Sequence, residues 1–449
     1  MKGATMYNYP KGLYIDVRIE DRYSTRITYR NNELQEQKVR SNKGAFIRVF
    51  DGNRWYYASL TNLDSIQDQI FTLAKMATPD PDIANHPYVK MYEVNNEELM
   101  QYEKQSLKEV ALEEKDKLIK EISDLCTDET IKLTNAFYEE DVTVKEIFTS
   151  KGAHVKFDKQ TCGLGLSIQC VYEDNKDRFF ASIAEIYFSE LHKAIPLFKE
   201  EIEKNIDFIK HAVSFEPGEY PVLMGPIATG VFTHESFGHK SESDFMVGDE
   251  AMRKEWTLGK QVGQSLLTII DDGTVEGNGF VPFDDEGTRG KKTHIITNGI
   301  LTDRLHSVAT AAALEEKPTG NARSINFEFE PIVRMTTTYI EKGSTPLKDI
   351  IKSIDYGIFV DTIKHGSGMS TFTIAPSRAY KIENGKITTP IKTSVVTGNV
   401  FETLQLVDAV SEEFQLLSFV GGGCGKMEQY PLPVGFGGPY TLVRKLNVM

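Results

Sequence analysis

The sequence changes character at the dipeptide Pro217-Gly218, and this boundary constrains the fold more than any other feature. Before it, runs with helical spacing are interleaved with strand-like runs. After it, glycine is frequent, helical runs are short or absent, and strand-like runs recur. Because one hydrophobic core rarely extends past ~250 to 300 residues, a chain of 449 residues is expected to form two domains. We predict an N-terminal domain over residues 1–215 and a C-terminal domain over residues 216–449.

The first half predicts a mixed α/β domain with long amphipathic helices. Residues 18–63 predict the strands of a meander whose turns are Asn-Asn-Glu and Asp-Gly-Asn. A helix is predicted over residues 63–77, and apolar residues spaced by three and four predict one long helix over residues 97–126. Further strands are predicted over residues 132–185, followed by a helix over residues 189–213.

The second half predicts a β-rich domain. Strand-like runs such as TTTYIEKG, YKIENGKITTP and GKKTHIITNGILTD recur there, and several of them contain Asn-Gly, a common hairpin turn. Helical runs in this half are short or absent. The predicted fold class is therefore α+β: a mixed α/β N-terminal domain with long amphipathic helices, followed by a β-rich C-terminal domain that carries the candidate metal site.

The charge and the cysteine count exclude several classes of protein. The chain has 51 Lys and Arg against 65 Asp and Glu, a formal net charge of −14, so direct nucleic-acid binding is not expected. No stretch approaches ~18 consecutive apolar residues, and the N-terminus lacks the apolar core of a secretory signal, so we expect neither a membrane span nor secretion. Four cysteines without a CxxC pair are too few for a disulfide framework, which favours the cytoplasm.

The motif with the most chemical content is His234-Glu235-x-x-x-His239, near the start of the second half. It is one residue longer than the zincin HExxH motif, in which two histidines bind zinc and the glutamate is the general base. In a regular helix, residues i and i+5 lie about 140° apart, so both histidines cannot face one metal ion. A local π-helical turn, or a helix that ends near Gly238, would bring them together.

A zinc site of this kind needs a third protein ligand, preferably nitrogen or thiolate sulfur. Cys424 is the best candidate, because SFVGGGCGKMEQ places it among four glycines, where the backbone can turn tightly and expose the side chain to a cleft. Cys126 lies on an apolar helical stripe, and Cys162 and Cys170 lie in strand-like runs. Burial in a core accounts for these three cysteines.

Each signal has an alternative explanation when it is taken alone. Surface or core histidines also produce HExxxH matches, and glycine-rich loops also serve as turns or phosphate cradles. GGGCGKMEQ lacks the Walker spacing and the Ser or Thr after Lys426, so a phosphate loop is not predicted. His294 and His306 have no second ligand-type residue at helical spacing. The carboxylate clusters Asp271-Asp272 and Asp284-Asp285-Glu286 each precede a glycine, which favours turns over catalytic pairs.

Several segments of the second half, taken together and in order, resemble the TldD/PmbA family, a group of metallopeptidase-like proteins often described as modulators of DNA gyrase. The first half resembles the family only in its general layout, notably in GAFIRVFDGNRWYYAS. The matching segments are YPVLMGPIATGVFTHESFGHKSESDF (residues 220–245), FDDEGT (283–288), GNARSINFEFEPIVRMTTTYIEKG (320–343), YKIENGKITTPIK (380–392) and GGGCGK (421–426).

The resemblance implies a zinc site in the subunit type that keeps HExxxH. The chain is therefore similar to the catalytic TldD-type subunit rather than to the PmbA-type partner, which lacks the motif. The family's zinc-binding cysteine falls on Cys424. Family members form dimers that enclose a cavity and cleave unfolded or short peptides. The resemblance thus implies a peptide or unfolded-protein substrate, and a partner that is either a second copy or a PmbA-type subunit.

These residues together predict a zinc-dependent peptidase in which His234, His239 and Cys424 hold Zn²⁺. Glu235 is expected to take the proton of the attacking water and deliver it to the leaving amine. Glu242, close to one turn beyond His239, is either a carboxylate that orients this imidazole or a solvated carboxylate at a helix end. The sequence assigns no substrate-binding residues.

Two other classes of function remain compatible with the sequence. A non-catalytic module that captures peptides by strand addition would need neither the metal nor Glu235. A regulatory protein that acts on gyrase would have to work through protein contacts, because a net charge of −14 opposes contact with DNA.

Overall fold

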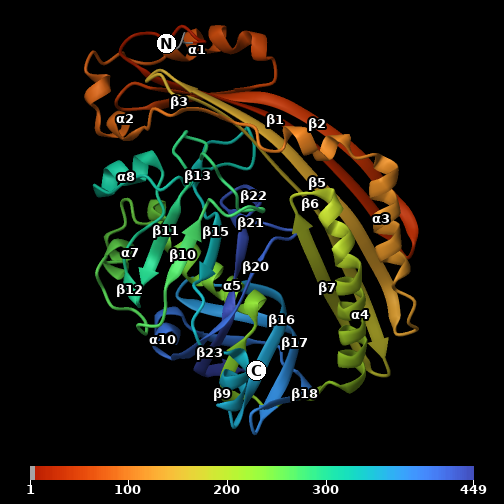
Figure 1. The fold of residues 1–449 in the computed structure, drawn as a ribbon. Helices are drawn as coiled ribbons and strands as arrows, with labels where there is room; N and C mark the ends of the chain where they lie inside the picture. The colour runs from red at the N-terminus through yellow and green to blue at the C-terminus, as the bar shows by residue number, and fades with distance from the viewer. Residues whose placement is uncertain (1–5) are drawn as a thin grey trace.

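The structure is a computed structural model that describes residues 6–449 and confirms the predicted α+β class (Figure 1). Helices and strands alternate in the first half of the chain. Its elements are β1 (Tyr14–Arg30), β2 (Glu33–Phe50), β3 (Trp55–Leu60), α1 (Ile66–Ala74), α2 (Pro87–Met91), β4 (Asn96–Leu99), α3 (Leu112–Asp124), β5 (Ile131–Thr149), β6 (His154–Tyr172), β7 (Asn175–Glu185) and α4 (Ala194–His211).

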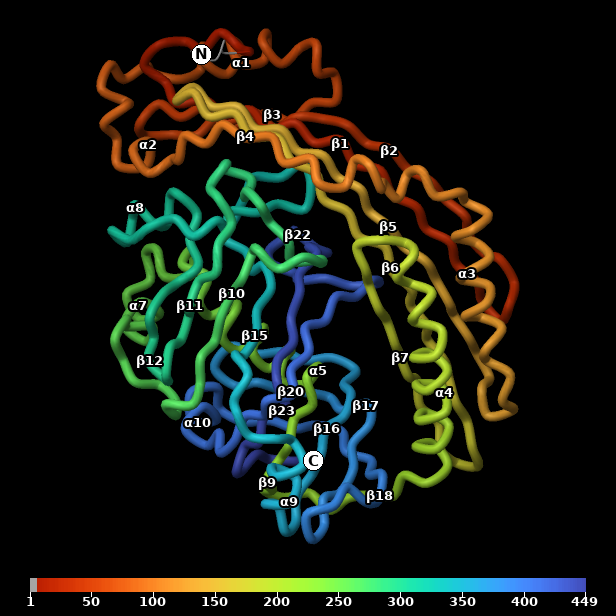
Figure 2. Tube along the Cα trace, viewed as in Figure 1, coloured from red at the N-terminus to blue at the C-terminus, as the bar shows by residue number. Residues whose placement is uncertain are grey.

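The strands of the first half form one sheet in the order β3-β2-β1-β5-β6-β4, with β7 also paired to β6. All neighbours are antiparallel except β4 and β6. β1, β2, β5 and β6 are 17 to 19 residues long, against about 5 to 6 in an average strand. The predicted turns are confirmed: Asn31 and Asn32 join β1 to β2 with φ of 50° and 65°, a conformation that asparagine tolerates. Figures 1 and 2 show these strands arching across the second half of the chain.

The two faces of this sheet have different partners because side chains alternate along a strand. On β6, Cys162 and Leu164 belong to the core that packs under α3 and α4. Phe157, on the opposite face, packs against Phe283 of the second half. The sheet therefore presents one face to its own helices and the other to the region that carries the candidate metal ligands.

The prediction of a single long helix over residues 97–126 is wrong, because side chains of β6 form hydrogen bonds with the backbone of this segment. The carboxylate of Asp158 accepts hydrogen bonds from the backbone N–H groups of Gln101 and Tyr102, at 2.7 and 2.9 Å. Gln160 accepts a further bond from Leu107, at 3.1 Å. These long-range bonds replace helical ones, so only α3 forms from the predicted stripe. The other two predicted helices are confirmed in shortened form, as α1 and α4.

The second half confirms the predicted β-rich character. Its largest sheet has twelve strands, with the main order β12-β11-β10-β15-β23-β9-β16-β17-β18-β8. Its elements are β8 (Val213–Ser214), β9 (Gly218–Met224), α5 (Pro226–Thr233), α6 (His239–Ser241), α7 (Glu250–Glu255), β10 (Ile269–Asp272), β11 (Lys292–Thr297), β12 (Ile300–Leu301), α8 (Val308–Leu314), β13 (Ala322–Arg323), β14 (Ile332–Val333), β15 (Thr337–Ile340), α9 (Leu347–Lys352), β16 (Tyr356–Ser367), β17 (Thr371–Glu383), β18 (Lys386–Lys392), β19 (Val396–Asn399), α10 (Val400–Gln405), β20 (Val407–Leu417), β21 (Cys424–Lys426), β22 (Gln429–Leu432) and β23 (Gly435–Val448).

Helix α5 lies against β15, β16 and β23 of this sheet, and its C-terminal end leads directly into the HExxxH motif. Both predicted Asn-Gly hairpins are confirmed: Asn298-Gly299 joins β11 to β12, and Asn384-Gly385 joins β17 to β18. The sheet thus fixes the position of the helix that carries two of the candidate metal ligands.

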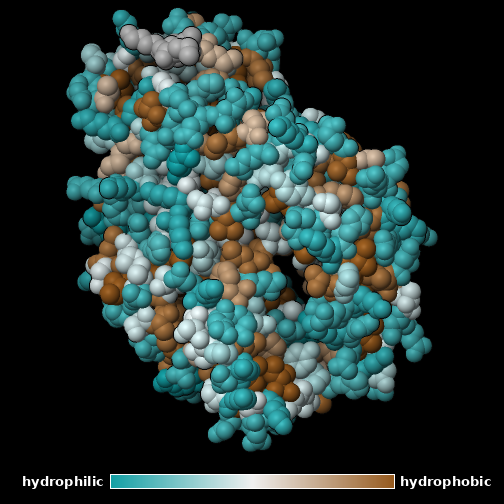
Figure 3. Space-filling view, in the orientation of Figure 1, coloured by the Kyte–Doolittle hydropathy of each residue, from teal (hydrophilic) through white to brown (hydrophobic). Residues whose placement is uncertain are grey.

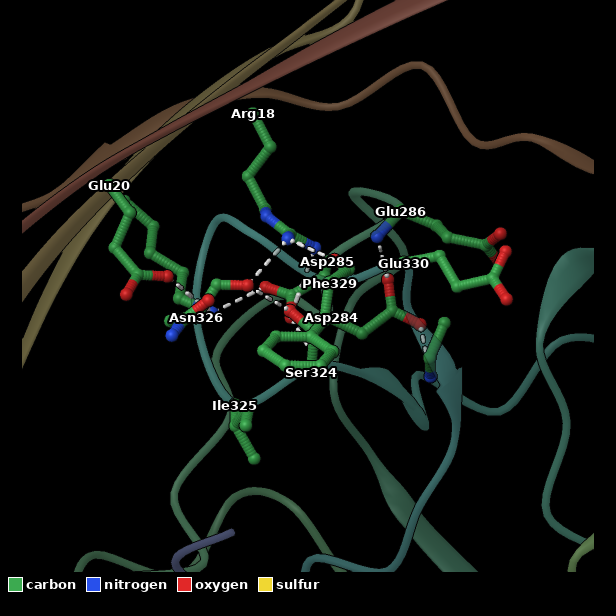
Figure 4. A network of polar contacts seen from close by, with 12 residues as sticks. Arg18, Glu20, Asp284, Asp285, Glu286, Ser324, Ile325, Asn326, Phe329 and Glu330 are labelled. Carbon is green, nitrogen blue, oxygen red and sulfur yellow. Dashed lines mark hydrogen bonds and ion pairs between the residues drawn. The ribbon is translucent and has the colours of Figure 1, made fainter. Parts of the chain in front are cut away.

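A buried ionic network joins the two halves of the chain. The carboxylate of Asp285 lies 2.6 Å from Lys145 Nζ of β5 and 3.3 Å from Arg18 NH1 of β1. Figure 4 shows Arg18 reaching from the N-terminal sheet toward Asp285 and Ser324. Burial by itself raises the pKa of Asp285, but the charges of Lys145 and Arg18 outweigh burial and hold the pKa below its usual range. Asp285 is therefore an ionised link between the sheet and the second half.

A second pair of bonds extends this network. Arg48 of β2 contacts Asp16 at 2.8 Å and Glu286 at 3.0 Å, and all three side chains are buried. The turn that the glycine after Asp284-Asp285-Glu286 predicted is present, since Gly287 donates to the Asp284 carbonyl. The sequence did not indicate that the carboxylates of this turn would be buried against the other half.

No helix within residues 6–449 is long and apolar enough to cross a membrane. The prediction that the chain has no secretory signal rests partly on residues 1–5, which lie outside the described residues.

We predict that Asp285→Asn lowers the free energy of unfolding by about 3 kcal/mol, because it leaves Lys145 and Arg18 buried without their shared anion. Asp177→Asn is the matched control. Asp177 also pairs across the two halves, with Lys364 at 2.7 Å, but both side chains are partly exposed, so less than about 1 kcal/mol is expected. Urea denaturation measures both changes, and equal losses would contradict the assigned role of Asp285.

Candidate functional site

The HExxxH motif lies on a π-helical turn. Helix α5 ends at Thr233, residues His234–Gly238 form the turn, and α6 begins at His239. The N–H of His239 bonds to the carbonyl of His234, five residues earlier, as a π-helix requires. The two imidazole rings consequently lie close, with centroids 5.1 Å apart and planes at 81°. Of the two alternatives that the spacing of the histidines predicted, the structure has the π-helical turn.

A second pair of residues stabilises the same turn. Phe232 and Phe237 are also five residues apart, and their rings meet edge to face with centroids 5.6 Å apart in the core. Gly238 is required for this packing, since a Cβ atom there would lie 1.8 Å from Met335 Sδ. The turn thus buries an aromatic pair on one side and brings two histidines together on the other.

Cys424 approaches the histidines from the hairpin formed by β21 and β22. Its Sγ lies 3.4 Å from His239 Nε2. His234, His239 and Cys424 each offer one ligand atom, and these atoms lie within 4.8 Å of one another. Arg334 donates a hydrogen bond to the backbone carbonyl of Cys424, at 2.8 Å, which fixes the hairpin from behind. The structure therefore brings together the three residues that the sequence analysis proposed as metal ligands.

The electrostatics of this cluster favour a thiolate. Burial raises the pKa of Cys424, but the charges and hydrogen bonds of His234 and His239 outweigh burial and lower the pKa to about 5. Burial lowers the pKa of His239, whereas its hydrogen bonds to Cys424 and Glu242 raise it to about 10. A thiolate beside two imidazoles is a donor set that zinc prefers.

Glu242 is fully buried and is therefore not a solvated carboxylate at a helix end. Its Oε2 lies 3.0 Å from His239 Nδ1, the nitrogen that faces away from Cys424. Burial raises the pKa of Glu242, but the hydrogen bond to His239 and the charges of His239, Lys426 and Arg334 lower it overall. The carboxylate is thus placed to orient the His239 imidazole through its second nitrogen.

The sequence analysis missed the contribution of Lys426 because it considered this residue only as a possible phosphate-loop lysine. Its Nζ lies 3.2 Å from Glu242, 2.6 Å from Asp244 and 2.9 Å from the carbonyl of Val333. Lys426 follows Cys424 by two residues on the same hairpin. One lysine therefore ties the Cys424 hairpin to the segment that carries His239.

The only local signal for Lys426 in the sequence is its spacing from Cys424. If Lys426 is buried beside Cys424, its charge needs a nearby carboxylate. The sequence does not show that Glu242 and Asp244 provide it. Arg334 gives a comparable signal, as a charged residue within the apolar run PIVRM. Both residues hold the hairpin by bonds to distant segments.

Two further observations bear on whether a metal fits this cluster. Nδ1 of His234 is buried and has no hydrogen-bond partner among residues 6–449. Glu235, the candidate general base, is half-buried on the π-helical turn, directly after His234. The donor set, the orphaned imidazole nitrogen and the adjacent carboxylate together fit a metal ion with three protein ligands.

The other histidines that the sequence analysis considered do not join this cluster. His294 is exposed on β11. His306 lies near Asp303 and Glu316, but its Nε2 is 2.7 Å from Glu316, which also pairs with Arg304. Glu316 is therefore held in this second cluster by a hydrogen-bond contact with His306 and an ion pair with Arg304.

Asp271 is buried and serves the fold. Its carboxylate accepts hydrogen bonds from Thr336, Thr338 and Asn321. Cys162 and Cys170 are buried and Cys126 is half-buried, away from the histidine pair, as the sequence analysis expected of core cysteines.

The chain matches two known domain families in sequence. Residues 217–449 match the PmbA/TldA metallopeptidase C-terminal domain, and residues 15–77 match PmbA/TldA metallopeptidase domain 1. The first match contains all the residues of the candidate metal cluster.

Individual proteins show the same similarity over most of the chain. A metalloprotease of Methanocaldococcus jannaschii is 32% identical over 442 residues, which cover 95% of each chain. A zinc metalloprotease TldD homologue of Saccharolobus solfataricus is 28% identical over 328 residues, which cover 71% of this chain and 72% of the relative. Among solved structures, TldE from Thermococcus kodakarensis has the same fold, with a TM-score of 0.74 at 19% identity and coverage of 97% and 96%.

We predict that Gly238→Ala destabilises the protein by about 1 to 3 kcal/mol, because the new methyl group overlaps Met335 Sδ. Alanine is the better helix former, so a loss of stability must come from this overlap. Met335→Ala removes the obstacle, so the double variant should lose less stability than the two single variants together. Urea denaturation of all three variants tests this, and strictly additive losses would show that the overlap does not matter.

Proposed function

Because the chain belongs to the PmbA/TldD metallopeptidase family, we propose that it is a zinc-dependent peptidase that hydrolyses unfolded or short peptides. The observation that carries this proposal is the convergence of His234, His239 and Cys424, with the half-buried Glu235 next to His234 in the chain. The name of the Saccharolobus solfataricus relative supports the choice of zinc.

Zinc would be held by the two imidazoles and the thiolate, and would polarise a water molecule and the scissile carbonyl. Glu235 takes the proton of the water and delivers it to the leaving amine, as a general base and then a general acid. Glu242 holds His239 by its Nδ1, which leaves Nε2 directed toward Cys424. Lys426 keeps Glu242 ionised and in place.

The retained HExxxH motif supports a TldD-type catalytic subunit rather than a PmbA-type one. We propose a dimer, formed either by two copies of this chain or with a PmbA-type subunit, that works on peptides in the cytoplasm. Direct binding of nucleic acid is not proposed, given the net charge of −14. Affinity capture of the native protein followed by mass measurement distinguishes the two kinds of dimer.

We predict that Glu235→Gln lowers kcat for peptide hydrolysis by about 10²- to 10⁴-fold, because it removes the general base. Zinc content should stay at the parent level, since Glu235 is not among the three clustered ligand residues. Cys424→Ser should lose both zinc and activity. Metal analysis and cleavage of a fluorogenic peptide measure the two effects separately.

Cys126→Ser is the matched control for Cys424→Ser, because Cys126 is half-buried in the other half of the chain. It should keep zinc and activity. If Glu235→Gln cleaves peptides as fast as the parent, the mechanism is wrong. If the parent binds peptides without cleaving them, the chain is a peptide-binding module instead.

We predict that Glu242→Gln weakens zinc affinity by about 10- to 100-fold, because the His239 imidazole loses its anionic hydrogen-bond partner. Competition with a chromophoric chelator measures this affinity without reference to activity. Lys426→Met should weaken affinity in the same range, since it releases the same carboxylate.

Glu242→Gln and Lys426→Met disturb the same chain of contacts. The double variant should therefore bind zinc about as tightly as the weaker-binding single variant. Lys120→Met, which alters an exposed pair with Asp124 on α3, is the matched control and should keep the parent affinity. Fully additive losses would show that Lys426 does not act through Glu242.

A further inference from the structure

A cavity of about 680 Å³ lies between the N-terminal sheet and the second half of the chain, beside the Cys424 hairpin. Gly421 and Gly422, which shortly precede Cys424, line it together with Tyr430 of β22. Phe137 and Phe180 line it from β5 and β7. Figure 3 shows the surface hollowed between the two halves of the molecule, with apolar residues at the opening.

The wall on the N-terminal side is aromatic and rigidly packed. The rings of Phe137 and Phe180 stack at 14°, with centroids 6.3 Å apart. Phe137 is buried, while Phe180 is 51% exposed. Glycines make room for the buried ring, since a Cβ at Gly165 or Gly421 would lie 2.2 or 2.6 Å from Phe137 Cζ. The buried ring of Phe137 therefore packs against the exposed ring of Phe180 and holds it in place.

The aromatic wall is fastened to the loop that leads to Cys424. Ser182 of β7 bonds to both the N–H and the carbonyl of Val420, at 2.9 and 3.1 Å. Glu139 of β5 accepts a hydrogen bond from the N–H of Gly421, at 2.9 Å. The N-terminal sheet and the Cys424 loop thus have a fixed relative position at this cavity.

The opposite wall carries a second exposed aromatic ring. Tyr430 is 61% exposed, and its ring approaches Gly425, the residue after Cys424. The ring therefore lies beside the backbone of the hairpin that carries Cys424.

Four of the five charged residues that line the cavity form ion pairs. Arg26 pairs with Glu139, and Lys364 pairs with Asp177. Arg178 donates to a serine hydroxyl of β6, at 2.7 Å. Apart from the exposed guanidinium of Arg178, the surfaces left free for a ligand are mainly the aromatic ones, which gain most by contact with another apolar group.

We propose that this cavity binds an aromatic or large aliphatic side chain of the peptide substrate and so selects peptides that expose such residues. The inference rests on the proposed peptidase function and assigns it a substrate class. Phe180 and Tyr430 determine the preference from opposite sides, and Phe137 supports Phe180. Unfolded chains meet this requirement, because folding buries the same side chains in a core.

The test compares peptide affinity with and without the exposed ring. The probes are fluorescein-labelled octapeptides of alanine and serine, in which one phenylalanine occupies each position in turn, and the same peptide without phenylalanine. Dissociation constants are measured by fluorescence anisotropy in the zinc-loaded Glu235→Gln protein, in which cleavage is suppressed. We expect one or two positions of phenylalanine to raise affinity by about tenfold.

In the same protein, Phe180→Ser and Tyr430→Ser should each remove most of this gain without changing the affinity of the peptide that lacks phenylalanine. Phe180→Tyr keeps the ring and should restore the gain. Phe71→Ser is the matched control, since Phe71 is 37% exposed on α1 and lies outside the cavity. Far-ultraviolet circular dichroism confirms that each variant is folded.

Equal loss of affinity for peptides with and without phenylalanine would overturn the proposal. The proposal would also be overturned if Phe180→Ser or Tyr430→Ser changed the molar mass measured by light scattering but left peptide affinity unchanged. The cavity would then be a contact between two copies of the chain. Absence of cleavage by the parent protein would refute the peptidase function alone, since the affinity measurements do not depend on hydrolysis.

Discussion

The contact between Lys426 and the carboxylates of Glu242 and Asp244 joins the two segments that carry the candidate metal ligands. Cys424 and His239 are 185 residues apart in the chain. Lys426 is buried, so its charge requires a nearby anion, and Glu242 is the anion that also holds His239. The ligand cluster therefore depends on a charge contact behind it. Loss of either partner would leave a buried charge next to the site.

The helix that carries the histidines is adapted to this arrangement. A π-helical turn is rare and is retained only where the surroundings compensate for it. Here Phe232 and Phe237 pack together on the core side, and Gly238 allows Met335 to approach. The packing of a hydrophobic core thereby sets the relative position of two candidate metal ligands, His234 and His239.

The first half of the chain contributes more than support. Its sheet is anchored by buried ion pairs such as Asp285 with Lys145, and its edge strand β7 is bonded to the loop before Cys424. An aromatic wall on this sheet therefore has a fixed position relative to the candidate metal cluster.

The sequence by itself determined the fold class and the turns, and it named the three residues that lie together in the candidate metal cluster, because these depend on local spacing and residue type. The spacing of the two histidines also predicted that the helix either widens locally or ends near Gly238. Tertiary structure decided the rest. Residues 97–126 do not form one helix, because Asp158 captures the backbone of Gln101 and Tyr102 from a strand distant in sequence. The environment of Glu242, the partner of Lys426 and the aromatic cavity likewise depend on contacts between distant segments, which local patterns do not encode.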